Sequence, residues 1–318
     1  MINNILVSII IPCYNKDKYI ERCLCSVEMQ NYNNIECIII DDCSNDNSLQ
    51  IIESYISNYK GNITFYLIRH KENTGPGPSI AKNNAINIST GKYLFFLDAD
   101  DEITDNCIFS LVELAEKYPG VDMIQGGILQ KKDKYEVFFQ KDKKPEILYG
   151  NDEIRKLYNI HGSIPVTTWN KLVRKDFIIN NNLYFKKGLV HEDIHWNFFW
   201  LKKIESLAVC EKITYIYNIV SDSITTNSNL FHSISTYLII VEDILSNIDI
   251  NYFEQELEKA ILFLNMQNDI ILSDEKYSSL IPKYKYLLNR IPGIKYYLFF
   301  IIKLLNCKIK KYINKIRN

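Results

Sequence analysis

The chain has 318 residues, of which 47% are hydrophobic and 24% are charged, so it can fold as one large or two modest domains with a substantial core. Its net charge of −1 is unevenly spread along the sequence. Eleven of the 37 Lys and Arg residues lie from Lys276 onwards, where there is no Asp or Glu. The residues before Lys276 contain the other 26 basic residues and all 38 acidic residues. No apolar run of the sequence approaches the roughly 20 residues of a membrane span, and we expect no signal sequence.

The first hundred residues alternate short apolar runs with segments of helical periodicity. Strands are predicted at 5–11, 35–40, 65–68 and 93–97, and helices at 19–29, 48–59 and 79–88. Continuous β-branched runs are typical of strands in a parallel sheet that is covered on both faces. Strands that alternate with helices predict an α/β fold with a doubly wound sheet.

After residue 101 the alternation loosens. We expect helices at 108–117, 151–158, 196–200 and 198–203, strands at 121–124 and 213–220, and a charged surface hairpin at 131–144. From Leu230 onwards the pattern is helical. We place a boundary near residue 225, between an α/β domain (1–225) and a helical C-terminal region (226–318).

Eight cysteines occur without the paired C-x2-C spacing of a zinc site. Several of them lie inside apolar strand or helix patterns. We therefore expect free, buried thiols in a reducing compartment.

The acidic stretch Asp98-Ala99-Asp100-Asp101 directly follows the predicted strand at 93–97. Ligands of open α/β sheets bind at the carboxyl ends of the strands. Mg²⁺ and Mn²⁺ prefer oxygen ligands and are usually held by one or two carboxylates together with substrate phosphates. The position predicts a metal–diphosphate site. The alternative is a solvated acidic turn or a helix cap.

Two other predicted strands end in polar or aromatic residues. Asp42 could accept a hydrogen bond from the imide N–H of a uracil ring, and Tyr14 could stack on that ring. The alternative for Asp42 is a turn or cap formed with Ser44. Three such strand ends in one sheet favour a nucleotide site.

The Gly/Pro-rich loop 73–78 leads into the helix at 79–88, which carries Lys82. Backbone N–H groups and a lysine near a helix N-terminus suit a diphosphate. The loop matches neither the dinucleotide-binding pattern nor a P-loop, and Lys82 is equally compatible with a plain surface lysine.

Glu192 and Asp193 precede a strongly aromatic segment, 196–200. A carboxylate at a helix N-terminus is stabilised as the anion and could act as a general base for a hydroxyl nucleophile. Helix capping is the alternative.

Aromatic and histidine side chains are further candidates. Trp169 could be a stacking platform for a sugar or a buried core residue. His191 or His195 could supply one metal ligand, although a structural histidine is the more frequent case.

The last predicted helix, 294–317, is amphipathic and basic. Its apolar face is formed by Leu298, Ile301, Ile302, Leu305, Ile309, Tyr312, Ile313 and Ile316. Lys308, Lys311 and Lys315 lie on another face. This pattern favours an interfacial helix attracted to anionic lipid over a helix packed on the body or on a second copy.

Residues 7–101 resemble a family 2 glycosyltransferase with the GT-A fold. The matching strings are V-S-I-I-I-P-C-Y-N-K (7–16), I-I-I-D-D-C-S-N-D-N-S (38–48), G-P-G-P-S-I-A-K-N-N-A (75–85) and G-K-Y-L-F-F-L-D-A-D-D (91–101). Further on, T-W-N-K-L (168–172), G-L-V-H-E-D-I-H-W (188–196) and Y-N-I-V-S-D-S-I-T (217–225) resemble the bacterial capsule, O-antigen and lipooligosaccharide branch. The resemblance covers roughly the first 225 residues. Lys82 and Asn218 stand at positions where this family often has Arg.

The resemblance implies a GT-A mixed sheet flanked by helices, with 1–101 as the nucleotide-sugar part and 102–225 as the acceptor part. The nucleotide-sugar site would be formed by Pro12, Tyr14, Asn15, Asp42, Lys82, Asp98 and Ala99. Asp100, with Asp98, would hold Mn²⁺ or Mg²⁺. Asp193 would be the catalytic base, and Glu192, Trp169 and Trp196 would contact the acceptor.

The resemblance further implies an inverting, metal-dependent hexosyl- or N-acetylhexosaminyltransferase. It would use a nucleotide-sugar, with a UDP-sugar favoured, and a glycan or lipid-linked glycan acceptor. We expect a cytoplasmic protein held at the inner leaflet of the membrane by its tail, with no nucleic-acid partner. The alternatives are a sugar-nucleotide pyrophosphorylase and a non-catalytic, membrane-associated glycan-binding protein.

Overall fold

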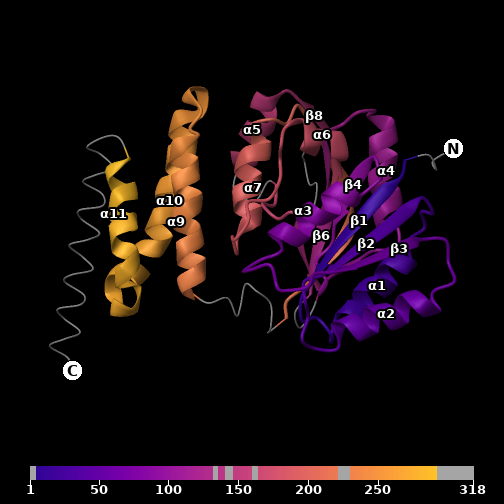
Figure 1. Ribbon diagram of the computed structural model, residues 1–318. Helices are drawn as coiled ribbons and strands as arrows, with labels where there is room; N and C mark the ends of the chain where they lie inside the picture. Colours follow the sequence, from indigo (N-terminus) through magenta and orange to yellow (C-terminus); the bar gives the residue numbers. More distant parts are fainter. Residues whose placement is uncertain (1–4, 132–134, 140–145, 160–163, 221–229, 292–318) are drawn as a thin grey trace. The chain divides into compact units, whose positions relative to one another are not determined.

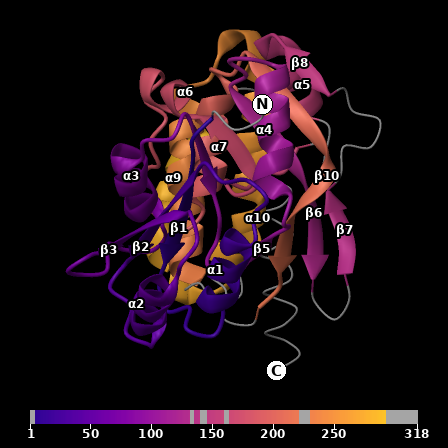
Figure 2. The ribbon, with the colours of Figure 1, turned by 90° about the vertical axis from the view of Figure 1, so that its right-hand side faces the viewer.

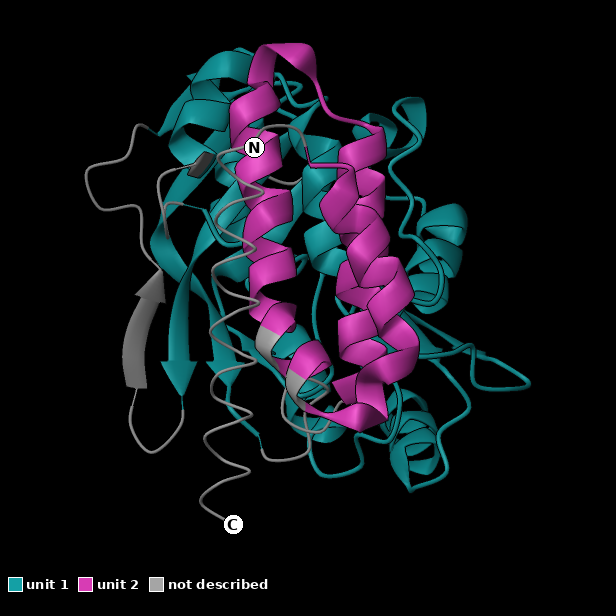
Figure 3. Cartoon of the chain, turned by 90° about the vertical axis from the view of Figure 1, so that its left-hand side faces the viewer, with its two compact units in different colours: residues 1–227 teal, residues 228–318 magenta. Residues whose placement is uncertain are grey.

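The computed structural model describes residues 5–131, 135–139, 146–159, 164–220 and 230–291. The chain divides into two compact units, Met1–Asn227 and Ser228–Asn318, shown in different colours in Figure 3. The boundary predicted from the sequence lies near residue 225. Each unit is described by itself.

The first unit contains a mixed sheet flanked by helices, as predicted (Figure 1). Its strands are β1 (Val7–Cys13), β2 (Ile35–Asp41), β3 (Thr64–Arg69), β4 (Tyr93–Phe96), β5 (Glu102–Ile103), β6 (Met123–Lys131), β7 (Tyr135–Phe139), β8 (Ile147–Tyr149), β9 (Lys171–Arg174) and β10 (Ser206–Asn218). The main order is β3-β2-β1-β4-β9-β6-β10-β5, with β7 paired to β6 and β8 paired to β10.

The first four strands form a parallel block that places the site. β1 pairs with β2 and β4, and β2 pairs with β3, all in parallel. The register sets Cys13 opposite Asp41 and Asp41 opposite Arg69, so these strands end together. The segments after the strand ends, including 98–101, therefore leave the sheet at one edge, where ligands bind in this class of fold.

The second half of the sheet contains strands that were not predicted. β9 lies between β4 and β6 and is antiparallel to both, whereas β6 and β10 are parallel. The strand predicted at 213–220 is the end of β10, which starts at Ser206 and has register shifts between Val209 and Tyr215. These irregularities hide the alternation expected of one long strand. β7 pairs antiparallel with β6, as expected for a hairpin (Figure 2).

The helices of the first unit lie close to where their periodicity predicts them. They are α1 (Ile20–Glu28), α2 (Ser48–Asn58), α3 (Ser79–Ile88), α4 (Cys107–Lys117), α5 (Asn151–Asn159), α6 (Lys175–Asn180) and α7 (Glu192–Leu201). The helices predicted at 196–200 and 198–203 are parts of one helix, α7, which begins at Glu192 and ends at Leu201, before the predicted end at 203. The short α6 was not predicted.

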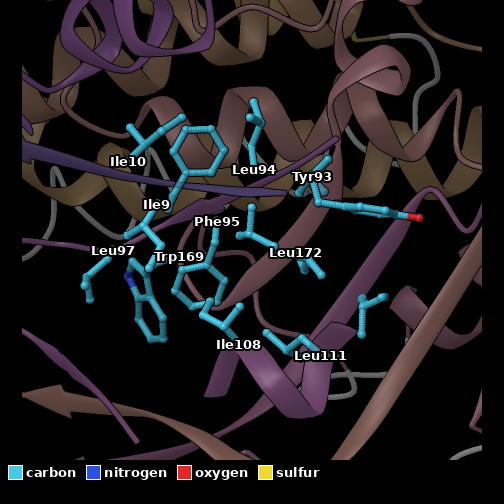
Figure 4. Packing of buried hydrophobic residues seen from close by; sticks show 14 of the residues in the cluster. Ile9, Ile10, Tyr93, Leu94, Phe95, Leu97, Ile108, Leu111, Trp169 and Leu172 are labelled. Atoms are coloured by element: carbon cyan, nitrogen blue, oxygen red, sulfur yellow. The ribbon is translucent and has the colours of Figure 1, made fainter. Parts of the chain in front are cut away.

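Buried side chains from these elements form one continuous core. Ile9, Phe95, Ile108 and Leu172 pack together within it (Figure 4). The seven cysteines in the described part of the chain are free thiols, as predicted. Cys25 on the outer face of α1 is exposed, however, and Cys43 is half-buried, so the expectation that all of them are buried is wrong for these two.

The second unit is helical in its described part. It contains α9 (Leu230–Ser246), α10 (Phe253–Ser273), α11 (Ile281–Asn289) and two short 3-10 segments, η1 (Ile250–Tyr252) and η2 (Glu275–Leu280). Among the residues that the structure describes, none of the helices combines the length and the apolar character needed to cross a bilayer. The predicted amphipathic helix at 294–317 lies outside the described residues.

Candidate active site

Three carboxylates gather directly after β4. One oxygen atom each from Asp98, Asp100 and Asp101 lies within 4.8 Å of the others. Asp101 is buried and anchors the turn: Tyr215 Oη donates to its Oδ2 over 2.8 Å, and the Asn218 main-chain N–H donates to its Oδ1 over 2.7 Å. Asp101 thus fixes the two preceding carboxylates relative to β10.

Burial makes Asp98 a weak acid. The pKa of this carboxyl group is raised to about 6: burial is the main cause and the neighbouring Asp100 and Glu192 add to it, whereas Lys82 and Lys16 oppose the rise. A divalent cation would favour the ionised form of Asp98 because it supplies opposite charge.

A lysine already contacts this acidic group. Lys16 Nζ lies 2.7 Å from Asp100 Oδ2, and both side chains are largely buried. The ion pair shows that Asp100 can pair with a cation, and carboxylate oxygens are the ligands that Mg²⁺ and Mn²⁺ prefer. The residues therefore fit a divalent metal ion, with Asp98 and Asp100 as the ligands expected from the sequence.

A buried ion pair joins the two predicted halves of the site. Lys82 on α3 donates to Glu192 Oε1 at the start of α7 over 2.8 Å, and both side chains are almost inaccessible. Burial acts to lower the pKa of Lys82, but attraction to Glu192 and Asp98 outweighs it and the pKa is raised. Lys82 is therefore a charged ammonium and not a plain surface lysine.

Asp193 is the second residue of α7. The Ile194 main-chain N–H donates to its Oδ1 over 2.8 Å, which is the expected stabilisation of an anion at a helix N-terminus. Burial nevertheless raises the pKa of Asp193, while the positive charge of Lys82 lowers it. A carboxylate with a raised pKa is a stronger base at neutral pH.

A second buried lysine supports the surroundings of Asp193. Lys171 on β9 donates to the carbonyls of Pro165 and Thr167, and burial lowers its pKa to about 7. Asn197 on α7 donates to the carbonyls of Val166 and Asp193. These contacts hold the chain before β9 against the beginning of α7.

The helix α3 is also tied to the segment before α7. Asn83 donates to the Phe185 carbonyl and accepts from the Phe185 N–H, both over 2.9 Å. Gly77, with φ +121°, approaches Leu189 so closely that a Cβ atom would lie 2.3 Å from its carbonyl oxygen. The Gly/Pro loop and the segment that carries Asp193 therefore fit against each other.

The carboxylate of Asp42 binds side-chain and main-chain groups of the loop that follows β3. Its carboxylate accepts from the N–H and hydroxyl of Thr74 and from Asn73, and His70 Nδ1 lies 2.6 Å from Oδ1. Asn84 Nδ2 in turn lies 2.8 Å from His70 Nε2. Asp42 thus holds the loop that leads to Lys82, whereas the N–H of Ser44, its partner in the predicted turn, donates to Asp41.

The remaining predicted nucleotide contacts lie at the same edge of the sheet. Tyr14 is 41% exposed, as a stacking platform requires, and Ala99 is buried between the carboxylates. Asn15 adopts φ 52°, and its N–H donates to Ser44 Oγ. Pro12 is the last but one residue of β1.

The tryptophans correct the predicted acceptor surface. Trp196 is 1% exposed, and its Nε1 donates to the Leu183 carbonyl. Trp169 is 8% exposed and stacks on Tyr215 with ring centroids 4.4 Å apart. Both rings are core residues, because neighbouring aromatic rings cover their faces.

Neither His191 nor His195 belongs to the acidic group identified among the described residues. His195 instead packs against Phe199. Burial lowers the pKa of His191.

Sequence reasoning did not assign roles to several residues of the site. They are Lys16, His70, Lys171, Tyr215 and Asn218. Lys16, Lys171 and Asn218 lie inside the strings that resemble the family, which was an available signal. His70 and Tyr215 act through partners that no local pattern reveals.

Known proteins share both sequence and fold with this chain. Residues 8–178 match the family model described as "Glycosyl transferase family 2". The uncharacterized glycosyltransferase YibD of Escherichia coli (strain K12) is 28% identical over 264 residues, which cover 78% of this chain and 72% of YibD. The poly(ribitol-phosphate) beta-N-acetylglucosaminyltransferase TarS of Staphylococcus aureus (strain MW2) is 27% identical over 185 residues, 57% of this chain but only 30% of TarS.

A solved structure shows the same fold. The crystal structure of S. aureus TarS 1–349 in complex with UDP-GlcNAc superimposes with a TM-score of 0.70, covering 90% of this chain and 82% of that chain at 20% identity. The match establishes the GT-A fold.

Proposed function

Because the chain belongs to glycosyl transferase family 2, we propose that it transfers a sugar from a UDP-sugar to a hydroxyl group of a glycan or lipid-linked glycan, with inversion. The related TarS binds UDP-GlcNAc in its crystal structure, which supports a UDP-sugar as donor. Relatives named as poly(ribitol-phosphate) glycosyltransferases support a role in bacterial surface polysaccharide synthesis.

One observation carries this proposal. The Lys82–Glu192 ion pair joins the helix after the Gly/Pro loop to the helix whose first turn carries the candidate base, although the two residues are 110 positions apart. A donor-side cation and an acceptor-side carboxylate thus meet in one buried site. Transfer between two substrates requires such proximity.

A divalent cation held by Asp98 and Asp100 would neutralise the charge that develops on the leaving diphosphate. The chain supplies further positive charge at this place through Lys16 and Lys82. Asp101 keeps the carboxylates oriented through its bonds to β10.

Asp193 takes the proton of the acceptor hydroxyl as that oxygen forms the new bond to the anomeric carbon. The bond from the anomeric carbon to the diphosphate oxygen breaks on the opposite face, and UDP leaves with its electron pair. The transition state has oxocarbenium character, and a single displacement inverts the anomeric centre.

We further propose that the protein works at the cytoplasmic surface of the cell membrane. The support is compositional: the basic residues from Lys276 onwards are accompanied by no acidic residue in the sequence. Removal of residues 292–318 should release the protein from membrane fractions. Equal sedimentation of the full-length and shortened chains with membranes would contradict this location.

The first experiment is a thermal-shift screen with UDP, GDP, CDP and dTDP in the presence of Mn²⁺. We expect UDP to raise the melting temperature and Asp100→Ala to abolish the shift, because a ligand stabilises the state that it binds. Asp105→Ala is the matched control, since it removes an exposed carboxylate from the same segment. No shift with any nucleotide would contradict the donor site and favour a non-catalytic glycan-binding protein.

Turnover provides the second measurement. The enzyme can be assayed before the acceptor is known, because water can replace the acceptor in a slow hydrolysis of UDP-N-acetylglucosamine or UDP-glucose. The UDP that is released measures the rate of this hydrolysis. NMR of the first-formed sugar then gives the anomeric configuration. Retention of configuration would contradict the single displacement.

A further inference from the structure

The Asp100 carboxylate is held by a lysine of the first loop. Lys16 Nζ donates to Asp100 Oδ2 over 2.7 Å, and the two side chains are 13% and 14% exposed. Arg22 and Asn218 instead donate to the main-chain oxygen of Asp100. The contact of Lys16 is therefore made with the very group that the proposed function assigns to the metal.

We propose that Lys16 and the divalent cation compete for Asp100, so that metal binding is coupled to donor binding. In the nucleotide-free protein the ammonium occupies one side of the carboxylate. A bound diphosphate offers the ammonium another anionic partner and thereby opens Asp100 to the metal. This inference rests on the proposed function, since it requires the donor and the metal to share the site.

Hydrogen bonds hold the main chain of Lys16 in place, and its side chain extends to Asp100. Its N–H donates to Ser48 Oγ over 2.7 Å, and its carbonyl accepts from the N–H groups of Tyr19 and Ile20. The neighbouring Asp17 N–H donates to Asp46 Oδ2. An exchange of partners thus needs only rotation of the flexible four-carbon stem, and the loop itself stays in place.

Electrostatics make simultaneous occupancy unfavourable. An ammonium and a divalent ion beside the same carboxylate repel each other, and the repulsion is stronger in a largely buried place than in bulk water. An ammonium that remains on Asp100 therefore repels an incoming metal. Removal of the ammonium leaves the cluster of Asp98, Asp100 and Asp101 without this cation, and its attraction for a metal increases.

Coupling between two ligands is reciprocal and typically changes an affinity by roughly 5- to 150-fold. If Lys16 carries the coupling, UDP raises the Mn²⁺ affinity of the wild-type protein by a factor in this range. Without the ammonium, Mn²⁺ already binds well alone and UDP adds less.

The test is a titration of Mn²⁺ into the full-length protein with and without UDP, with free Mn²⁺ measured by electron paramagnetic resonance. Lys16→Met removes the charge, Lys16→Arg keeps it, and Lys18→Met removes the same charge from an exposed position two residues away. We expect Lys16→Met to bind Mn²⁺ alone at least about 5-fold more tightly than wild type and to show a smaller effect of UDP. Lys16→Arg and Lys18→Met should resemble wild type.

Equal Mn²⁺ affinities of the wild-type and Lys16→Met proteins without UDP would overturn the competition while leaving the metal site in place. An absence of Mn²⁺ binding in both proteins would overturn the metal site as well, and UDP binding measured without metal would show whether the donor site still stands. A larger thermal stabilisation of Lys16→Met by Mn²⁺ provides an independent readout, because bound ligand stabilises the folded state.

Discussion

The ammonium of Lys82 lies 2.8 Å from the carboxylate of Glu192, and the two side chains are only 3% and 7% exposed. Burial raises the pKa of Glu192, whereas the charge of Lys82 lowers it. Each charge is thus tolerated in the interior because the other is present.

Removal of one partner of this pair should be costly. Lys82→Met leaves a buried carboxylate without its cation, and such changes destabilise proteins by about 3–5 kcal/mol. The double variant Lys82→Met/Glu192→Gln should recover part of this loss, because both charges are gone. Urea unfolding of the single and double variants measures the effect. The exposed pair Lys156–Glu153 is the matched control and should show a much smaller change.

Asp193→Asn should lower turnover by roughly 10²- to 10⁴-fold, because the amide cannot accept the proton of the acceptor hydroxyl. UDP binding should persist, since Asp193 is assigned to the acceptor side. Release of UDP from a UDP-sugar gives the rate, and the thermal shift with UDP and Mn²⁺ gives the binding. Near-normal turnover in a folded Asp193→Asn protein would remove Asp193 from the role of base, and Asp105→Asn serves as the control.

Stability should depend on pH through Asp98. Its pKa is about 6 in the folded protein, whereas an unperturbed aspartate has a pKa of 3.8, so folding favours the protonated form. The resulting cost is absent below about pH 4, grows as the pH rises through 6, and reaches on the order of 3 kcal/mol above it.

Asp98→Asn should therefore gain stability relative to wild type between pH 4 and pH 7. Urea unfolding at the two pH values gives this difference. The comparison with wild type cancels the opposite contributions of Glu36 and Asp46, whose pKa values are lowered by hydrogen bonds despite burial. A constant difference between the two proteins across this range would contradict the assignment.

Two glycines of the Gly/Pro loop allow a matched comparison. Gly75 and Gly77 both have φ +121°, so alanine is strained at either position. A Cβ atom at Gly75 meets nothing within 4 Å, whereas one at Gly77 lies 2.3 Å from the Leu189 carbonyl oxygen. Gly77→Ala should therefore lose about 1–3 kcal/mol more than Gly75→Ala and bind UDP more weakly. Equal melting temperatures of the two variants would show that the contact with Leu189 is unimportant.

The parallel half of the sheet was predictable because its strands are buried on both faces. β1 and β2 are mainly apolar, interrupted inside the strands only by Ser8 and Glu36, and their buried positions agree with that pattern. β9 was missed because four residues with Lys171 and Arg174 at their ends do not resemble a buried strand. This strand is buried because β4 and β6 pair with it on either side, and such pairing cannot be read from the local sequence.

The candidate site was likewise predictable from local sequence in one part and dependent on tertiary contacts in another. Asp98, Asp100 and Asp193 were predicted as site residues from their places at the end of a strand and the start of a helix. The contact of Asp101 with Tyr215 joins residues 114 positions apart, and it depends on the pairing of β10 with β5 and β6. The burial of Trp169 depends on the same strand, because its ring stacks on Tyr215 and Tyr217.

The two hydrogen bonds between Asn83 and Phe185 also bear on how the protein is made. Asn83 leaves the ribosome 102 residues before its partner, so its amide has only water to bind while most of the sheet is being synthesised. Domains fold largely in the order of synthesis, and contacts between distant positions close late. The parallel strands β1 to β4 can therefore assemble first, and the site is completed only when α7 and β10 have been translated. A chain that ends before Phe185 contains every carboxylate assigned to the metal and has no base.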